Sequence, residues 1–194
     1  DMRDYMFPIK KFFNKNITSV EQLQNFIQER SAHVTQTTLF GYLKTRIGTR
    51  YQMMFEDEEF SKSINIAKWN IYTSAIADCT LYVFSYLINQ KNLKQNDAEK
   101  IYLSILENEK KNGLDEKLFS NSIIEFNQRL KNVNWDNYYK EKPFSESGLA
   151  LYKWSPIADN LKVLDKEIVL NSIKLKWNIV ENEFKELTKD LKFN

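Results

Sequence analysis

The chain has 194 residues, a net charge of +2, and only 4 Gly and 3 Pro. So few Gly and Pro residues disfavour turn-rich β folds and α/β folds with Gly-rich loops. The small net charge argues against a general nucleic-acid binder, and the single cysteine, Cys79, excludes an intramolecular disulfide framework and fits a reducing compartment.

Residues 1–16 combine aromatic side chains with lysines around Pro8, which limits any continuous helix. Two interpretations stay open for this N-terminal arm. It packs its aromatic side chains on the rest of the chain, or it docks on a partner or an anionic membrane surface. The candidate docking residues are Phe7, Lys10, Lys11, Phe12 and Phe13. We predict that residues 17–194 form the folded domain.

The first predicted helix begins at the sequence TSVE, which fits a capping box with Thr18 as the cap and Glu21 reaching back. Apolar residues then follow helical spacing until Gly48, a plausible C-terminal stop. Gly41 lies inside this helix, where glycine is unfavourable by about 1 kcal/mol relative to alanine. We therefore expect a close helix crossing or a bend at Gly41.

The second predicted helix runs from about Asp57 to Gln90, with acidic residues in its first turn that suit the helix dipole. Between Trp69 and Gln90 there is no Lys or Arg, and Asp78 is the only charged residue. Polar residues interrupt this stretch, so it falls short of the ~20 predominantly apolar residues of a membrane span. A helix buried in a bundle is the better interpretation.

The C-terminal half contains three more predicted helices. The first follows a capping box, NDAE at 96–99, and ends near Lys111 before Gly113, and the second covers 115–131. Residues 132–148 look like a loop, and Ser155-Pro156 reads as a helix cap followed by proline at the first helical position. The last helix, over 165–191, carries two apolar stripes: Ile168, Leu175 and Ile179 on one side, and Ile173, Trp177, Val180, Phe184, Leu187 and Leu191 on the other.

No segment has convincing strand alternation. The sequence therefore predicts an all-α fold, a single-domain helical bundle of about five to six helices, two or three of them long.

Catalytic and metal-binding patterns are incomplete. There is no G-x-S-x-G motif, and a Ser-His-Asp arrangement would have to use His33, the only histidine. There is no C-x-x-C, no H-E-x-x-H and no pair of histidines. Cys79 sits in an apolar run and is typical of a packed core residue. We predict no catalytic residue, no metal and no cofactor.

A candidate binding face combines His33, Tyr42, Arg46 and Arg50. Basic residues near a helix C-terminus stabilise the helix dipole, which is one explanation for Arg46 and Arg50. The alternative is a clamp for an acidic or aromatic partner.

Two stretches, SAHVTQTTLFGYLKTRIGTRY (31–51) continued by MMFEDEEFSKSINIAKWNIY (53–72), and KWSPIADNLKVLDKEIVLNSIKLKW (153–177), carry a resemblance. They resemble an uncharacterised alphaproteobacterial family whose members often bear the automatic label "esterase". The resemblance covers about a third of the chain. It implies a cytoplasmic protein, or alternatively one of the mitochondrial matrix, peripheral to the inner membrane, and it brings no active-site residues with it.

Long helices, many aromatic residues and incomplete catalytic patterns lead to one main hypothesis. We expect a non-catalytic interaction protein (an adaptor, scaffold or assembly factor) that binds a protein partner and is peripheral to a membrane complex. The alternatives are a hydrolase, as the family label suggests, and a helical bundle that binds a small molecule near His33 and Tyr42. No nucleic-acid partner is expected.

Overall fold

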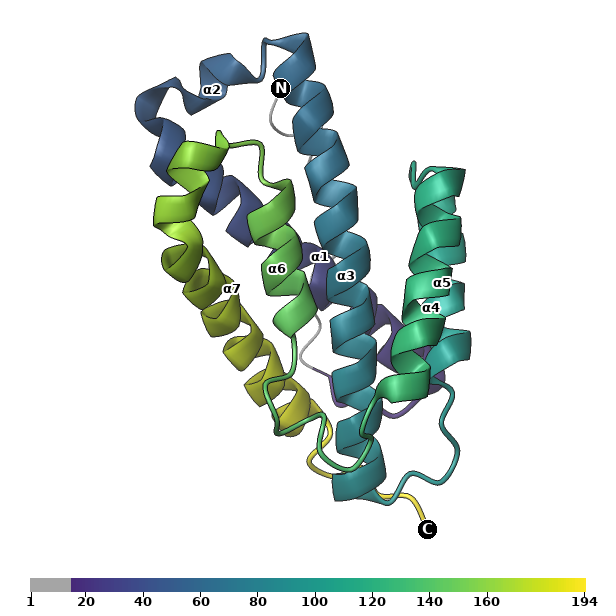
Figure 1. Ribbon diagram of the computed structural model, residues 1–194. Helices are drawn as coiled ribbons and strands as arrows, with labels where there is room; N and C mark the ends of the chain where they lie inside the picture. The colour runs from purple at the N-terminus through teal and green to yellow at the C-terminus, as the bar shows by residue number, and fades with distance from the viewer. Residues whose placement is uncertain (1–14) are drawn as a thin grey trace.

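The computed structural model describes residues 15–194, and over these residues it contains helices and loops but no strand (Figure 1). Six helices have ten residues or more, and three of them are long, which confirms the predicted all-α bundle. The elements are α1 (Val20–Ile47), the 3₁₀ turn η2 (Gly48–Arg50), α2 (Tyr51–Met54), α3 (Glu58–Lys91), α4 (Ala98–Lys110), α5 (Glu116–Asn132), α6 (Ser145–Trp154) and α7 (Asp159–Leu187).

Helix α3 is the centre of the bundle, packed by α1, α4, α5 and α6 (Figure 1). Among the described helices it is the one long and apolar enough to cross a membrane, but 89% of its most apolar window is buried inside the protein. A helix buried in a protein core can be as long and as apolar as a membrane-spanning helix. The continuous apolar run of α3 therefore serves packing on all sides.

Helix α7 runs along one edge of the molecule and packs on α6 and α1 (Figure 1). Two contacts place it antiparallel to α1: Arg30 pairs with Glu183, and Tyr42 donates to Asp165. The inward face of α7 is one of the two apolar stripes predicted from the sequence. On this face the Trp177 ring stacks on the Phe144 ring, with the two ring centroids 4.2 Å apart. The buried apolar residues of this face are Val169, Ile173, Trp177, Val180 and Phe184.

Several predicted helix ends are shifted. Ser19, not Thr18, caps α1, because its side chain accepts from the backbone N–H of Gln22. Asp97 precedes α4, and the nearby Asn96 side chain accepts from the N–H of Ala98. Ser155 does not cap the start of a helix as predicted; it closes α6 by donating to the carbonyl of Leu151.

Helix α6 begins within the predicted loop, residues 132–148, and continues past its end. The loop prediction is therefore wrong for residues 145–148. The start of α6 is set by Phe144, a non-glycine residue in the left-handed region with φ 69°. Helix α6 comes close to α7, and a Cβ at Gly148 would lie 3.3 Å from a methyl carbon of Leu170. Helix α7 then begins at Asp159, six residues before the predicted start.

The two glycines of the α1 region behave differently. Gly48 ends α1 as predicted, with φ 71°, a conformation that a side chain disfavours. Gly41 was expected at a close helix crossing or a bend; the close crossing is wrong, and the bend stays a prediction. Gly41 is exposed, and a Cβ added there would meet no atom within 4 Å.

Candidate functional site

Two of the four predicted binding residues meet at α7. The hydroxyl of Tyr42 donates to Oδ2 of Asp165 at 2.8 Å, and Nε of Arg46 lies 3.1 Å from the same oxygen. Arg46 also donates to the backbone carbonyl of Leu161. Burial, and then the contact with Asp165, raise the pKa of Tyr42. These side chains therefore join α1 to α7.

The other two predicted residues lie apart from this contact. His33 is nine residues before Tyr42 on α1, about 13 Å along the helix axis. Its side chain is only partly covered, and this partial burial, together with the positive charges of Lys176 and Arg30, lowers its pKa. Arg50 is exposed in the 3₁₀ turn. The structure thus brings Tyr42 and Arg46 together at Asp165 and leaves His33 and Arg50 apart from that contact, and a binding role for each stays a prediction.

The predicted docking residues of the N-terminal arm, Phe7, Lys10, Lys11, Phe12 and Phe13, lie outside the described residues. Within residues 15–194 there is no group of three or more His, Cys, Asp or Glu side chains that could hold a metal ion.

A buried charged cluster connects α3, α5 and α6. The carboxylate of Asp78 is fully buried and lies 2.7 Å from Nη2 of Arg129. Its other oxygen accepts from the backbone N–H of Ser147 at 2.7 Å. Burial works against the charge of Arg129, but the interactions with Asp78, Tyr138 and Glu146 together outweigh it and raise the arginine pKa. The hydroxyl of Tyr138 accepts from Arg129 and completes the cluster.

A polar cleft of about 390 Å³ opens beside this cluster between α3, α5 and α6. Both signs of charge line it: Glu125 and Arg129 from α5, and Glu146 and Lys153 from α6. Its size falls in the range of small-molecule sites. The cleft can offer hydrogen bonds to a small polar molecule, but neither His33 nor Tyr42, the residues predicted for such a site, lines it.

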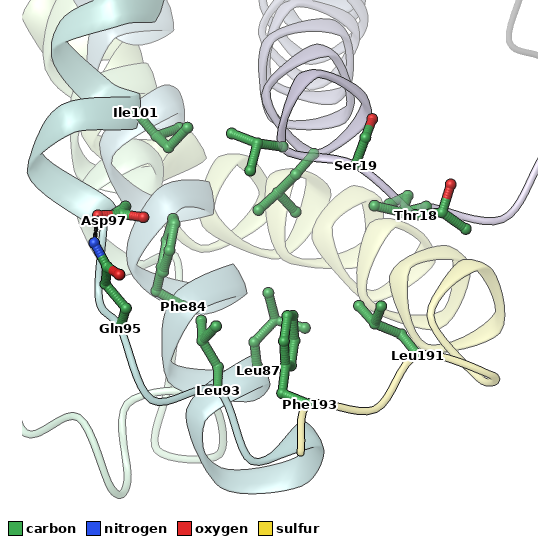
Figure 2. A pocket seen from close by; sticks show the side chains of 13 residues that line it. Thr18, Ser19, Phe84, Leu87, Leu93, Gln95, Asp97, Ile101, Leu191 and Phe193 are labelled. Atoms are coloured by element: carbon green, nitrogen blue, oxygen red, sulfur yellow. Dashed lines mark hydrogen bonds between the residues drawn. The ribbon is translucent and has the colours of Figure 1, made fainter.

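A smaller apolar hollow of about 160 Å³ lies where the start of α1, the end of α3 and the C-terminal segment meet. Figure 2 shows Phe84, Leu87 and Phe193 around it, with Asp97 at its rim. An apolar cavity of about 150 Å³ has room for one benzene-sized group. The hollow is thus large enough for a ring and below the volume typical of a substrate site.

The outward face of α7 is the most unusual surface of the described chain. Leu164, Ile168, Leu175 and Ile179 are exposed by 72, 69, 65 and 54%. We call these four residues the outer stripe. Their spacing places them within about 60° of arc on an ideal helix. Leu161 and Val163, also exposed, extend the apolar surface at its N-terminal end.

Charged residues flank the outer stripe. Glu167 and Lys174 are both exposed and lie on the same side of it, two helical turns apart. The sequence analysis found this apolar stripe but did not predict a binding site there. The pattern that could have indicated one is the presence of two apolar stripes on a helix that needs only one to pack against a core.

Comparison of the chain with family models, with curated proteins and with solved structures gives no significant match. The resemblance to the alphaproteobacterial family therefore stays a prediction.

Proposed function

We propose that this is a helical interaction protein that binds an amphipathic helix of a protein partner through the outward face of α7. The observation that carries the proposal is the outer stripe, four aliphatic side chains in line on an exposed face. Recognition of one helix by another uses anchors at this i, i+4, i+7 type of spacing. Contiguous apolar patches on a protein surface commonly mark interaction sites.

Other exposed apolar residues in the described chain are more scattered. Ile66 on α3, Leu103 on α4 and Ile124 on α5 are single exposed aliphatic side chains on helices whose other large aliphatic residues are at least partly buried. Single exposed residues of this kind are ordinary. Six of the 13 exposed large hydrophobic residues of the described chain lie on α7, which supports a specific role for this helix.

The charges beside the outer stripe favour a protein partner over an anionic membrane. A helix that lies on such a membrane is typically rich in Lys and Arg on its polar face. Here Glu167 and Lys174 place both signs beside the apolar side chains. A partner helix with an aliphatic stripe, a base opposite Glu167 and an acid opposite Lys174 would be complementary.

Gel filtration of extract from the native host tests this proposal. We expect the tagged chain to elute in a complex larger than its own mass. The double variant Ile168→Lys/Leu175→Lys should elute as a monomer, because charges would replace the anchors. The matched control Leu103→Lys/Ile124→Lys, at exposed aliphatic positions of α4 and α5, should keep the complex. A monomeric native chain, or a complex that survives in the outer-stripe variant, would refute the proposal.

The hydrolase function implied by the family resemblance stays a prediction. The only thiol, Cys79, is fully buried, and burial raises its pKa to about 12, which opposes thiolate formation at neutral pH. A screen of short-chain esters with His33→Ala as the control would test this alternative. Ester hydrolysis by the native chain that is lost in that variant would support it.

A further inference from the structure

The outer stripe is symmetric along α7. Ile168 and Leu175 lie equally far on either side of the point between Asn171 and Ser172, and so do Leu164 and Ile179. Two such helices placed antiparallel about a two-fold axis at this point would bring Leu164 opposite Ile179 and Ile168 opposite Leu175. A two-fold interface requires this kind of self-complementary surface.

The flanking charges have the same symmetry. In an antiparallel helix pair, residues on the same flank of the two helices face each other across the seam. Glu167 and Lys174 share one flank and are centred within one residue of the same point. Each Glu167 would therefore approach Lys174 of the other copy, and the two-fold axis would form this pair twice. In a parallel arrangement the two residues would lie two turns apart, about 10 Å, and would not pair.

Asn171 adds a polar group close to the axis. It is exposed and lies at the edge of the outer stripe. A polar residue within an apolar helix seam fixes the register and orientation of the pair at some loss of stability. The helix also has room for a neighbour, because α1 and α6 pack on its inward side and it forms an edge of the molecule (Figure 1).

From these observations we propose that the partner helix is α7 of a second copy of this chain, bound antiparallel through the outer stripe. This inference rests on the proposed function and names the partner. The outer stripe spans only about 23 Å, so the interface lies at the small end of specific protein contacts. The dimer should therefore dissociate within the concentration range of a sedimentation experiment, so that variants can be seen to strengthen or weaken it. The gel filtration of extract accordingly has to be run with the chain above this dissociation range.

Sedimentation equilibrium of the purified chain with charge variants tests the pairing. Glu167→Lys and Lys174→Glu should each weaken the native dimer by about tenfold or more, since each replaces two attractions with two repulsions. An equimolar mixture of the two variants should form a heterodimer, because both cross-pairs are then attractive. The double variant Glu167→Lys/Lys174→Glu should regain the native dimerisation.

The matched control is Lys185→Glu, which makes the same charge change on the same flank but outside the paired region. It should leave the dimer unchanged, and far-UV circular dichroism should give the same helix content for every variant. A monomeric native chain, or single variants whose mixture fails to restore association, would overturn the inference. So would a monomer that binds anionic phospholipid vesicles through the outer stripe.

This experiment separates the two proposals. If the purified chain is monomeric while the complex in extract still depends on Ile168 and Leu175, the second copy is ruled out and the interaction function stands. If the complex in extract ignores the outer stripe, the proposed function itself fails.

Discussion

The carboxylate of Asp78 is fully buried, and the ion pair with Arg129 and the hydrogen bond from the N–H of Ser147 compensate for its lost hydration. Removing one partner of such a pair leaves a charge without compensation in a poorly solvated place. Replacing both partners by neutral groups removes this penalty. The cluster therefore makes a sharp prediction about double variants.

Arg129→Met should destabilise the fold by about 3 kcal/mol, because it leaves the Asp78 carboxylate buried with no cation. Asp78→Asn/Arg129→Met should recover part of this loss, since the asparagine amide oxygen can still accept from Ser147. Urea unfolding followed by circular dichroism measures both. A double variant no more stable than Arg129→Met would contradict the account.

Tyr82 and Tyr138 give a second contrast between two buried hydroxyls. In the described part of the chain the Tyr82 hydroxyl has no hydrogen-bond partner, whereas that of Tyr138 bonds Arg129 and the N–H of Phe144. Tyr82→Phe should therefore be neutral or stabilising by about 1 kcal/mol, and Tyr138→Phe destabilising by about 1–2 kcal/mol. Thermal unfolding of the two variants decides, and the opposite order would count against these contacts.

At the scale of residues, the sequence indicated which side chains are polar or charged but not which residues they would contact. Tyr42 and Arg46 were recognised as polar residues near a helix end, yet their common partner, Asp165, is 119 or more residues away in the chain. Helical periodicity describes one helix at a time and does not say which face meets which neighbour. The Asp78–Arg129 pair was missed for the same reason.

At the scale of elements, Gly41 and Gly48 predict opposite outcomes for the same substitution. Gly41 lies inside α1, in its C-terminal part, with open space around it, so Gly41→Ala should stabilise the protein by about 0.5–1 kcal/mol. Gly48 has φ 71°, so Gly48→Ala should destabilise it. Chemical unfolding of both variants measures the difference. Destabilisation by Gly41→Ala would contradict the open space found around Gly41 in the structure.

The long helices were predictable from the sequence, whereas the short helices α2 and α6 were not. The bounds expected for the second helix, 57–90, differ by one residue from those of α3. Helix α6 was missed because its ten residues begin among Asn, Ser and aromatic residues that also suit a loop. Three of its four buried residues, Ser147, Gly148 and Ala150, are small, so they permit close packing but leave Leu151 as its only buried large apolar side chain, which gives no clear periodicity.

At the scale of the molecule, residues 15–194 bury their apolar faces around α3 but leave the outward side of α7 exposed. An apolar face of this length is costly in water and is relieved by binding. The symmetric order of its aliphatic and charged residues indicates a second copy as the partner. The polar cleft beside Arg129 is a separate feature and is left free by this arrangement, because α7 does not line it.

The most direct test of this account is the alkylation rate of a cysteine placed on the outer stripe, measured in extract of the native host. Cys79 is buried and should remain silent, so Ile168→Cys and Ile124→Cys each report on one exposed position. We predict that Ile168→Cys reacts several-fold more slowly than Ile124→Cys. The difference should disappear when Leu175→Lys is added. Equal rates at the two positions would show that nothing covers the outer stripe and would contradict the central claim.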